Sequence, residues 1–221
     1  MGSVFGEVLP YAMVVAISPI TIIAVILMLL APKAGGTSFG FLLGWVAGIL
    51  LATGIFIVLA ATIGLGAATG GAPAGASWVK LLLGVLLLVL AVKQWQNRPD
   101  EGERAELPGW LTAIDKVTPV KAAMLGFLLS AVNPKNLMMC VAAGVTIVTG
   151  DHRIVPWLVF TILAASTVAI PVIAYAVNAG RMRRPLDNLK VWLEQNNATV
   201  LFMLLLVIGV VLLGKGLGGL F

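Results

Sequence analysis

Asn133-Pro134-Lys135-Asn136 interrupts an apolar run that extends from about Ala122 to Thr149. The run is long enough to cross a bilayer, so these four residues are expected near its middle. Proline removes a backbone donor, and such a break survives in hydrocarbon only where it packs in protein or lines a wet cavity. A lysine at that depth costs roughly 3 kcal/mol to insert, and such residues tend to face the bundle interior. The stretch is therefore predicted to be the working centre of an all-α integral membrane protein.

The composition of the 221 residues excludes a soluble domain, because 60% of them are hydrophobic and only 10% are charged. The mean hydropathy of +1.08 agrees. A formal net charge of +5 can indicate a nucleic-acid partner, but the basic residues lie beside the apolar runs. Retention on the cytoplasmic side explains them more simply, and no nucleic-acid partner is expected. The single cysteine, Cys140, lies within an apolar run, which excludes a disulfide framework and a CxxC redox pair.

Six candidate transmembrane spans follow from the apolar runs, each near or above the roughly 20 residues that a crossing needs. They cover residues 8–30, 38–63, 77–92, 122–149, 154–177 and 198–214. A long hydrophilic connection over about 93–121 divides them into two groups of three. The chain is thus predicted to be a single membrane domain, 1–221, with repeat one over about 8–92 and repeat two over about 122–214.

The first and fourth spans carry matching interruptions. Ser18-Pro19 lies about eleven residues into the first span, and Asn133-Pro134 lies about twelve residues into the fourth. Thr21 and Asn136 each stand three positions after the residue that precedes the proline. Three spans per half make the two halves enter the membrane from opposite sides, so this arrangement fits two inverted three-helix repeats. Paired interruptions of this kind point to the binding site of a transporter.

Lysine and arginine residues are distributed unequally between the two sides of the predicted membrane domain. Apart from Lys135, ten of them fall on one side, whereas the other side has only Lys80, Arg153 and Lys215. The positive-inside rule places the richer side in the cytoplasm. We therefore expect a multi-pass protein of the inner (plasma) membrane with both termini outside.

The inventory of reactive side chains argues against an enzyme. His152 is the only histidine and lies in a short turn, so a buried serine–histidine pair is absent. The spans contain no paired aspartates for acid–base catalysis and no cluster of metal ligands. We therefore expect no cofactor and no metal site. A carrier is favoured over a channel, which would more often show a ring of like residues, and over a structural protein, which would not need a lysine at the midplane.

The candidate substrate-binding residues lie at the two interruptions, with a weaker polar pair in the fifth span: Ser18, Pro19, Thr21, Asn133, Pro134, Lys135, Asn136, Ser166 and Thr167. With no carboxylate in the spans to pair with it, Lys135 is either uncharged through desolvation or paired with an anionic head group. Alternatively, Lys135 caps carbonyls left open by the break. Asn133 and Asn136 either orient the ligand or satisfy the broken backbone, and Thr21 can back-bond to the preceding turn. Because insertion of a lysine is costly, Lys135→Met should leave folding intact or improve it.

Glycine recurs every four positions in the second span, at Gly40, Gly44 and Gly48. One helix face is therefore bare, as close helix contact requires. Whether that face meets a helix of the same chain or of a second copy in a homodimer stays open at this point. The expected partners are membrane lipids and an anionic amphiphilic substrate.

Several short motifs resemble one family. Asn133-Pro134-Lys135 looks like the signature of the lysine-exporter (LysE) superfamily, small six-helix exporters built from two three-helix halves. Ile17-Ser18-Pro19 stands where its amino-acid exporters usually carry proline-glycine-proline, and together with Gly40-Phe41-Leu42-Leu43-Gly44-Trp45 it resembles the GAP branch. GAP proteins are the glycolipid- or sulfolipid-addressing proteins of mycobacteria and relatives. The resemblance implies a secondary transporter that exports a lipid or glycolipid component towards the cell envelope; export of an amino acid or another small metabolite is the alternative.

Overall fold

The computed structural model describes residues 2–31, 34–65, 74–96 and 117–220, together with Gly109, Leu111 and Ile114. This part of the chain is all-helical, as predicted, and contains no strand. Most of the connection predicted over 93–121 lies outside the described residues. The helices are α1 Gly2–Ala16, α2 Pro19–Leu30, α3 Ala34–Thr62, α4 Ala74–Gln96, α5 Pro119–Ala131, α6 Pro134–Val148, α7 Ile154–Val177 and α8 Ala179–Leu217.

Helices α3, α7 and α8 and residues 75–96 of α4 are each long and apolar enough to cross a bilayer. Helices α1 and α2 form a further candidate span that is bent by 55°, and α5 and α6 form another that is bent by 62°. Counting each bent pair as one span gives up to six crossings in the described part of the chain. These features identify a multi-pass membrane protein, and the two predicted interruptions are confirmed as breaks in the helices.

Each proline of the two interruptions lies in the first turn of the helix that follows it. Pro19 begins α2 and Pro134 begins α6. At this position the missing N–H would have no helical acceptor, and the fixed φ angle of proline suits the helix. The chain therefore breaks before each proline instead of bending at a proline within a continuous helix.

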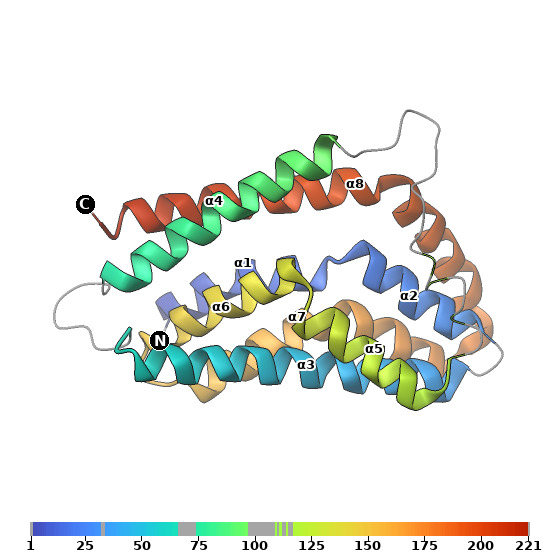
Figure 1. Cartoon of the computed structure of the whole chain (residues 1–221). Coiled ribbons are helices and arrows are strands. Elements are labelled where there is room, and N and C mark those ends of the chain that lie inside the picture. Colours follow the sequence, from blue (N-terminus) through green and yellow to red (C-terminus); the bar gives the residue numbers. More distant parts are fainter. Residues whose placement is uncertain are drawn as a thin grey trace.

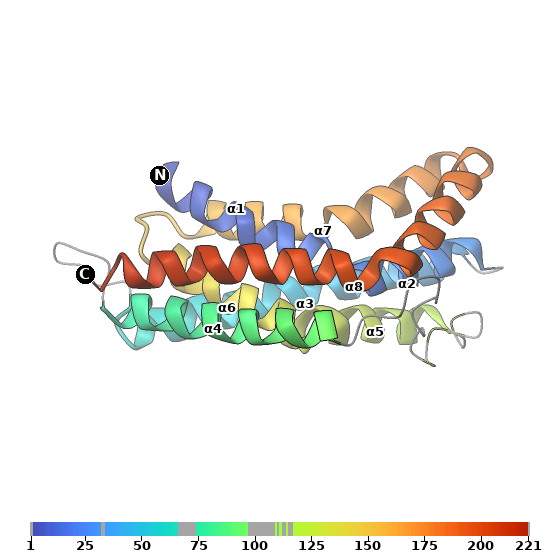
Figure 2. The same ribbon diagram turned by 90° about the horizontal axis from the view of Figure 1, so that it is seen from above.

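The helices form a bundle in which α4 and α8 pack together along one side (Figure 1). On the opposite side α3 packs against α5 and α7, and α1 and α6 lie between the two sides. The start of α1 and the end of α8 lie at the same end of the molecule in both views (Figure 1 and Figure 2).

Helix α8 differs from its prediction, because it begins at Ala179 instead of near residue 198. The basic segment that precedes the predicted span is helical and continuous with it. This first part of α8 lies at a steep angle to the rest of the helix (Figure 2). Leu186 and Leu193 are buried there, so tertiary packing holds a segment that its hydropathy places in a connection.

The glycine face of α3 lets α5 approach closely. A Cβ atom added at Gly44 would overlap the backbone carbonyl of Ala123 in α5. From the other side, a Cβ atom added at Gly126 would overlap the carbonyl of Phe41 in α3. The bare face predicted from the sequence therefore contacts a helix of the same chain.

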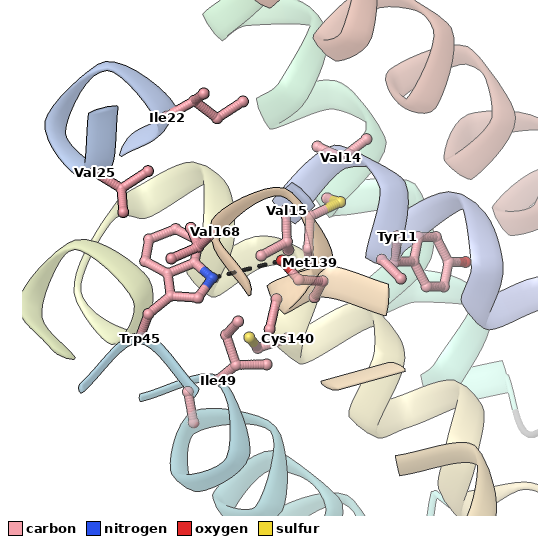
Figure 3. Packing of buried hydrophobic residues seen from close by; sticks show 14 of the residues in the cluster. Tyr11, Val14, Val15, Ile22, Val25, Trp45, Ile49, Met139, Cys140 and Val168 are labelled. Atoms are coloured by element: carbon pink, nitrogen blue, oxygen red, sulfur yellow. Dashed lines mark hydrogen bonds between the residues drawn. The ribbon is translucent and has the colours of Figure 1, made fainter. Parts of the chain in front are cut away.

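Trp45 lies at the centre of the core, beside Val25 of α2 and Val168 of α7 (Figure 3). Its side chain is fully buried, and its Nε1 donates a long hydrogen bond of 3.5 Å to the carbonyl of Ala164 in α7. Since α3 belongs to the first group of spans and α7 to the second, this side chain joins the two groups.

Replacing Gly44 by alanine is expected to destabilise the protein, because the added methyl group forces α5 away; such overpacking costs about 1–3 kcal/mol. Gly214→Ala in α8 is the matched control, since a Cβ atom there meets nothing within 4 Å. Thermal unfolding in detergent, followed by circular dichroism, measures both variants. Equal midpoints for the two variants would contradict the close contact between α3 and α5.

Candidate functional site

The two helix breaks meet at one cavity of about 370 Å³. Both prolines form part of its wall, and leucine and isoleucine residues of α2, α4, α5 and α8 form the rest of its apolar lining. Its polar lining residues are Ser18, Thr21, Lys93, Gln94, Asn133 and Lys135. The structure thus brings six of the nine predicted site residues together, whereas Asn136, Ser166 and Thr167 do not line the cavity.

The end of α1 has carbonyls that lack their usual helical donors. In a continuous helix the N–H of Ser18 would bond to Val14, but here it donates to the carbonyl of Ala16 at 2.9 Å. Pro19 has no N–H to offer to the carbonyl four residues before it. A buried polar group left without a partner costs about 1–3 kcal/mol, so these carbonyls need donors from elsewhere.

Lys135 supplies donors to this end of α1. Its Nζ donates to the carbonyl of Val14 at 2.7 Å and to that of Ile17 at 3.3 Å. A cation at the C-terminal end of a helix is also favoured by the helix dipole. Lys135 is 8% exposed and spends two of the three N–H donors of its ammonium group in this way. Lys135 therefore caps carbonyls, as one of the two interpretations of the sequence predicts. These carbonyls belong to the first break, whereas Lys135 itself lies at the second.

Thr167 of α7 also donates to this end of α1, because its Oγ1 bonds to the carbonyl of Ala16 at 2.5 Å. The neighbouring Ser166 instead donates to the carbonyl of Leu163 in its own helix at 2.7 Å. The structure thus places Thr167 at the first break and leaves Ser166 away from it. Since Lys135 and Thr167 both belong to the second group of spans, the end of α1 depends on the other half of the molecule.

The second break is closed by residues close in sequence. Oδ1 of Asn133 accepts a hydrogen bond from the backbone N–H of Lys135 at 3.0 Å and so caps α6. Nδ2 of Asn136 donates to the carbonyl of Leu129, in the last turn of α5, at 3.0 Å. Asn136 is fully buried, and its Oδ1 has no hydrogen-bond partner within the described part of the chain. Both asparagines satisfy the broken backbone, and Asn133 also lines the cavity.

Ser18 and Thr21 form a buried pair at the start of α2. Oγ1 of Thr21 donates to Oγ of Ser18 at 3.1 Å. Thr21 therefore bonds to a side chain, and not to a carbonyl of the preceding turn as back-bonding would require. The Ser18 side chain makes no capping hydrogen bond to the backbone of α2, so the first N–H groups of that helix gain no partner from it.

Lys93 and Gln94 of α4 line the cavity but are absent from the predicted site residues. The apolar run of the third span ends at residue 92, whereas α4 continues to Gln96 and carries both side chains along the cavity. The signal in the sequence is a lysine and a glutamine that directly follow a short apolar run. Among the described residues, no acidic side chain forms an ion pair with Lys93 or with Lys135.

An ion-pair cluster connects three helices at the other end of the molecule. Oε2 of Glu7 in α1 lies 3.1 Å from Nζ of Lys80 in α4 and 3.5 Å from Nζ of Lys215 in α8. The thirteen positions from Lys80 to Lys93 correspond to about 20 Å along α4. The cluster therefore closes the bundle far from the cavity, which lies between α2 and the α4–α8 pair.

Comparison with known families gives one match over nearly the whole chain. A family model described as "Sap, sulfolipid-1-addressing protein" matches residues 8–218. The matched range includes both helix breaks and every lining residue of the cavity. No curated protein and no solved structure matches the chain.

Thr167→Val keeps the shape of the side chain but removes the hydroxyl that donates to the carbonyl of Ala16. We expect a loss of about 0.5–1.5 kcal/mol in the free energy of unfolding, because the buried carbonyl of Ala16 loses one of its two donors and keeps the N–H of Ser18. Ser166→Ala is the matched control and should change stability by no more than about 0.5 kcal/mol, as its hydroxyl bonds only within α7. Denaturation in detergent compares the two. A loss for Thr167→Val no larger than that for Ser166→Ala would contradict the capping role.

Proposed function

The chain belongs to the sulfolipid-1-addressing protein family, and from this premise we propose that it is a secondary membrane transporter. Its proposed activity is export of an anionic lipid or glycolipid component towards the cell envelope. The observation that carries the proposal is the single cavity at which both proline breaks meet. In transporters built from repeats, substrates bind where such broken helices come together near mid-depth.

The pattern of helix contacts supports an inverted repeat. If α1–α4 correspond to α5–α8, the contact of α3 with α5 has its counterpart in the contact of α7 with α1. The contacts of α3 with α6 and of α2 with α8 likewise correspond to those of α7 with α2 and of α6 with α4. We therefore propose two repeats, over about 8–92 and 122–214, within one membrane domain. Together with the motifs at Ile17-Ser18-Pro19 and Gly40–Trp45, this architecture supports our proposal that the family is the GAP branch of the lysine-exporter superfamily.

The lining of the cavity favours an anionic amphiphile. Lys93 and Lys135 both line it, and no acidic side chain is among the described lining residues. Helices α2 and α6 begin at its wall, so the positive ends of two helix dipoles lie there. Leucine side chains of α4, α5 and α8 provide the apolar part of the lining. A charged head group with an attached acyl chain matches this combination better than a small polar metabolite does.

The orientation that we propose has both termini outside and the cavity facing the cytoplasm, following the distribution of lysine and arginine. The cluster of Glu7, Lys80 and Lys215 then lies at the closed outer end. Export would require this cluster to open while the halves rock and close the cavity near Lys93. The substrate would thereby pass from the cytoplasmic to the outer side.

A leaflet-transfer assay tests the proposal. Full-length protein is reconstituted into phosphatidylcholine vesicles with a trace of a nitrobenzoxadiazole-labelled sulfated glycolipid, and dithionite bleaches the label that reaches the outer leaflet. Ile20→Trp should fill the cavity and reduce transfer to the protein-free rate. Ile170→Trp is the matched control, because Ile170 is 64% exposed on α7 and is not a cavity residue; it should transfer at the wild-type rate.

Equal transfer by both tryptophan variants would overturn the central cavity as the substrate path. If wild-type vesicles release labelled lysine but transfer no lipid, the substrate is a small metabolite and not a lipid. Movement of neither probe would contradict a transport function.

A further inference from the structure

One face of α4 carries a shallow apolar groove of about 340 Å³. It is lined by Val85, Leu88, Val89, Val92 and Lys93, which recur at intervals of three and four residues and so form one stripe along the helix. The three valines are between 43% and 53% exposed. In a membrane this stripe would be in contact with hydrocarbon along its length, with a positive charge at one end.

The groove lies along the edge of the contact between α4 and α8, because Leu88 lines the groove and also packs against α8. A Cβ atom added at Gly209 of α8 would come within 2.8 Å of the Leu88 side chain, so the two helices are closely packed at this level. A ligand in the groove would therefore lie along the surface of the helix pair instead of separating it. A lipid could enter such a groove sideways from the bilayer.

Lys93 belongs to both the groove and the central cavity. Leu90 and Gln94 line the cavity, whereas Val89 and Val92 line the groove. Around the end of α4 the surface thus changes from apolar groove to partly polar cavity, with Lys93 at the boundary. A lysine suits this place, because its stem can lie along apolar surface while its ammonium group remains in polar surroundings.

The charge on Lys93 is also better available to a ligand than that on Lys135. The ammonium group of Lys135 already donates two hydrogen bonds to carbonyls at the end of α1. Within the part of the chain that the structure describes, Lys93 has no ion pair. An anionic head group at the mouth of the cavity would therefore meet Lys93 first.

We propose that the transported amphiphile lies with its acyl chain in the α4 groove and its anionic head group on Lys93, at the entrance to the cavity. This inference rests on the proposed transport function and names the binding path of the same site. Moving each methylene group of the acyl chain out of hydrocarbon costs free energy. A path that leaves the acyl chain in the bilayer while the head group enters the cavity is therefore favoured.

A photoreactive lipid tests the binding path directly. Full-length protein in phosphatidylcholine vesicles is irradiated with a sulfated glycolipid that carries a diazirine on its acyl chain, and mass spectrometry maps the adducts. They should concentrate at Val85, Val89 and Val92. Lys93→Gln should lower the adduct yield about tenfold, as expected for loss of one charge-assisted contact. Lys121→Gln, which removes an exposed lysine at the start of α5, should keep the wild-type yield.

Adducts spread evenly over the exposed residues of α3, α7 and α4 would indicate bulk bilayer lipid and overturn the groove. A diazirine-labelled phosphatidylcholine that marks the stripe as strongly as the sulfated lipid would overturn the role of Lys93. The measurement reads binding and not transfer, so it separates the two proposals. A labelled stripe without lipid transfer would refute the transport function alone, whereas transfer without a labelled stripe would refute only this inference.

Discussion

The structure depends on closing the open carbonyls at the end of α1, because a buried backbone carbonyl without a donor is costly. Lys135 and Thr167, from the other half of the molecule, provide the donors. Each hydrogen bond to a charged group contributes about 1.5–3 kcal/mol to stability. The two bonds of Lys135 together therefore contribute at least as much as the roughly 3 kcal/mol that its insertion costs. The two hydrogen bonds of Lys135 therefore offset the cost of burying it, and the first break takes these donors from the second half.

The two breaks match in sequence but are closed in different ways. The first is closed across the halves, whereas Asn133 and Asn136 close the second from within its own span pair. In the first half, Ile20 occupies the position that Lys135 has in the second. The halves are consequently joined at the first break through the backbone of α1, and at one end of the bundle through Glu7. The cavity lies towards the other end, where α2 faces the α4–α8 pair.

The positions of both breaks could be predicted from the sequence, because the effect of proline on the backbone is local. The meeting of Ser18 and Asn133 at one cavity followed from the correspondence of the two spans. The acceptors of Lys135 could not be predicted, since they lie 121 and 118 residues away and depend on how α1 packs against α6. Thr167 and Ser166 are adjacent and chemically similar, and only the rotation of α7 decides which one reaches α1. Lys93 was not among the predicted site residues, because hydropathy does not show which way α4 turns this side chain.

Unfolding of Lys135→Met in detergent is the most direct measurement of whether this lysine holds the first break together. The variant should be less stable than the wild type, because the carbonyls of Val14 and Ile17 lose their donor and each unpaired group costs about 1–3 kcal/mol. The cost of burying the lysine, taken alone, predicts the opposite sign. A stability equal to that of the wild type or above it would show that the first break does not depend on Lys135.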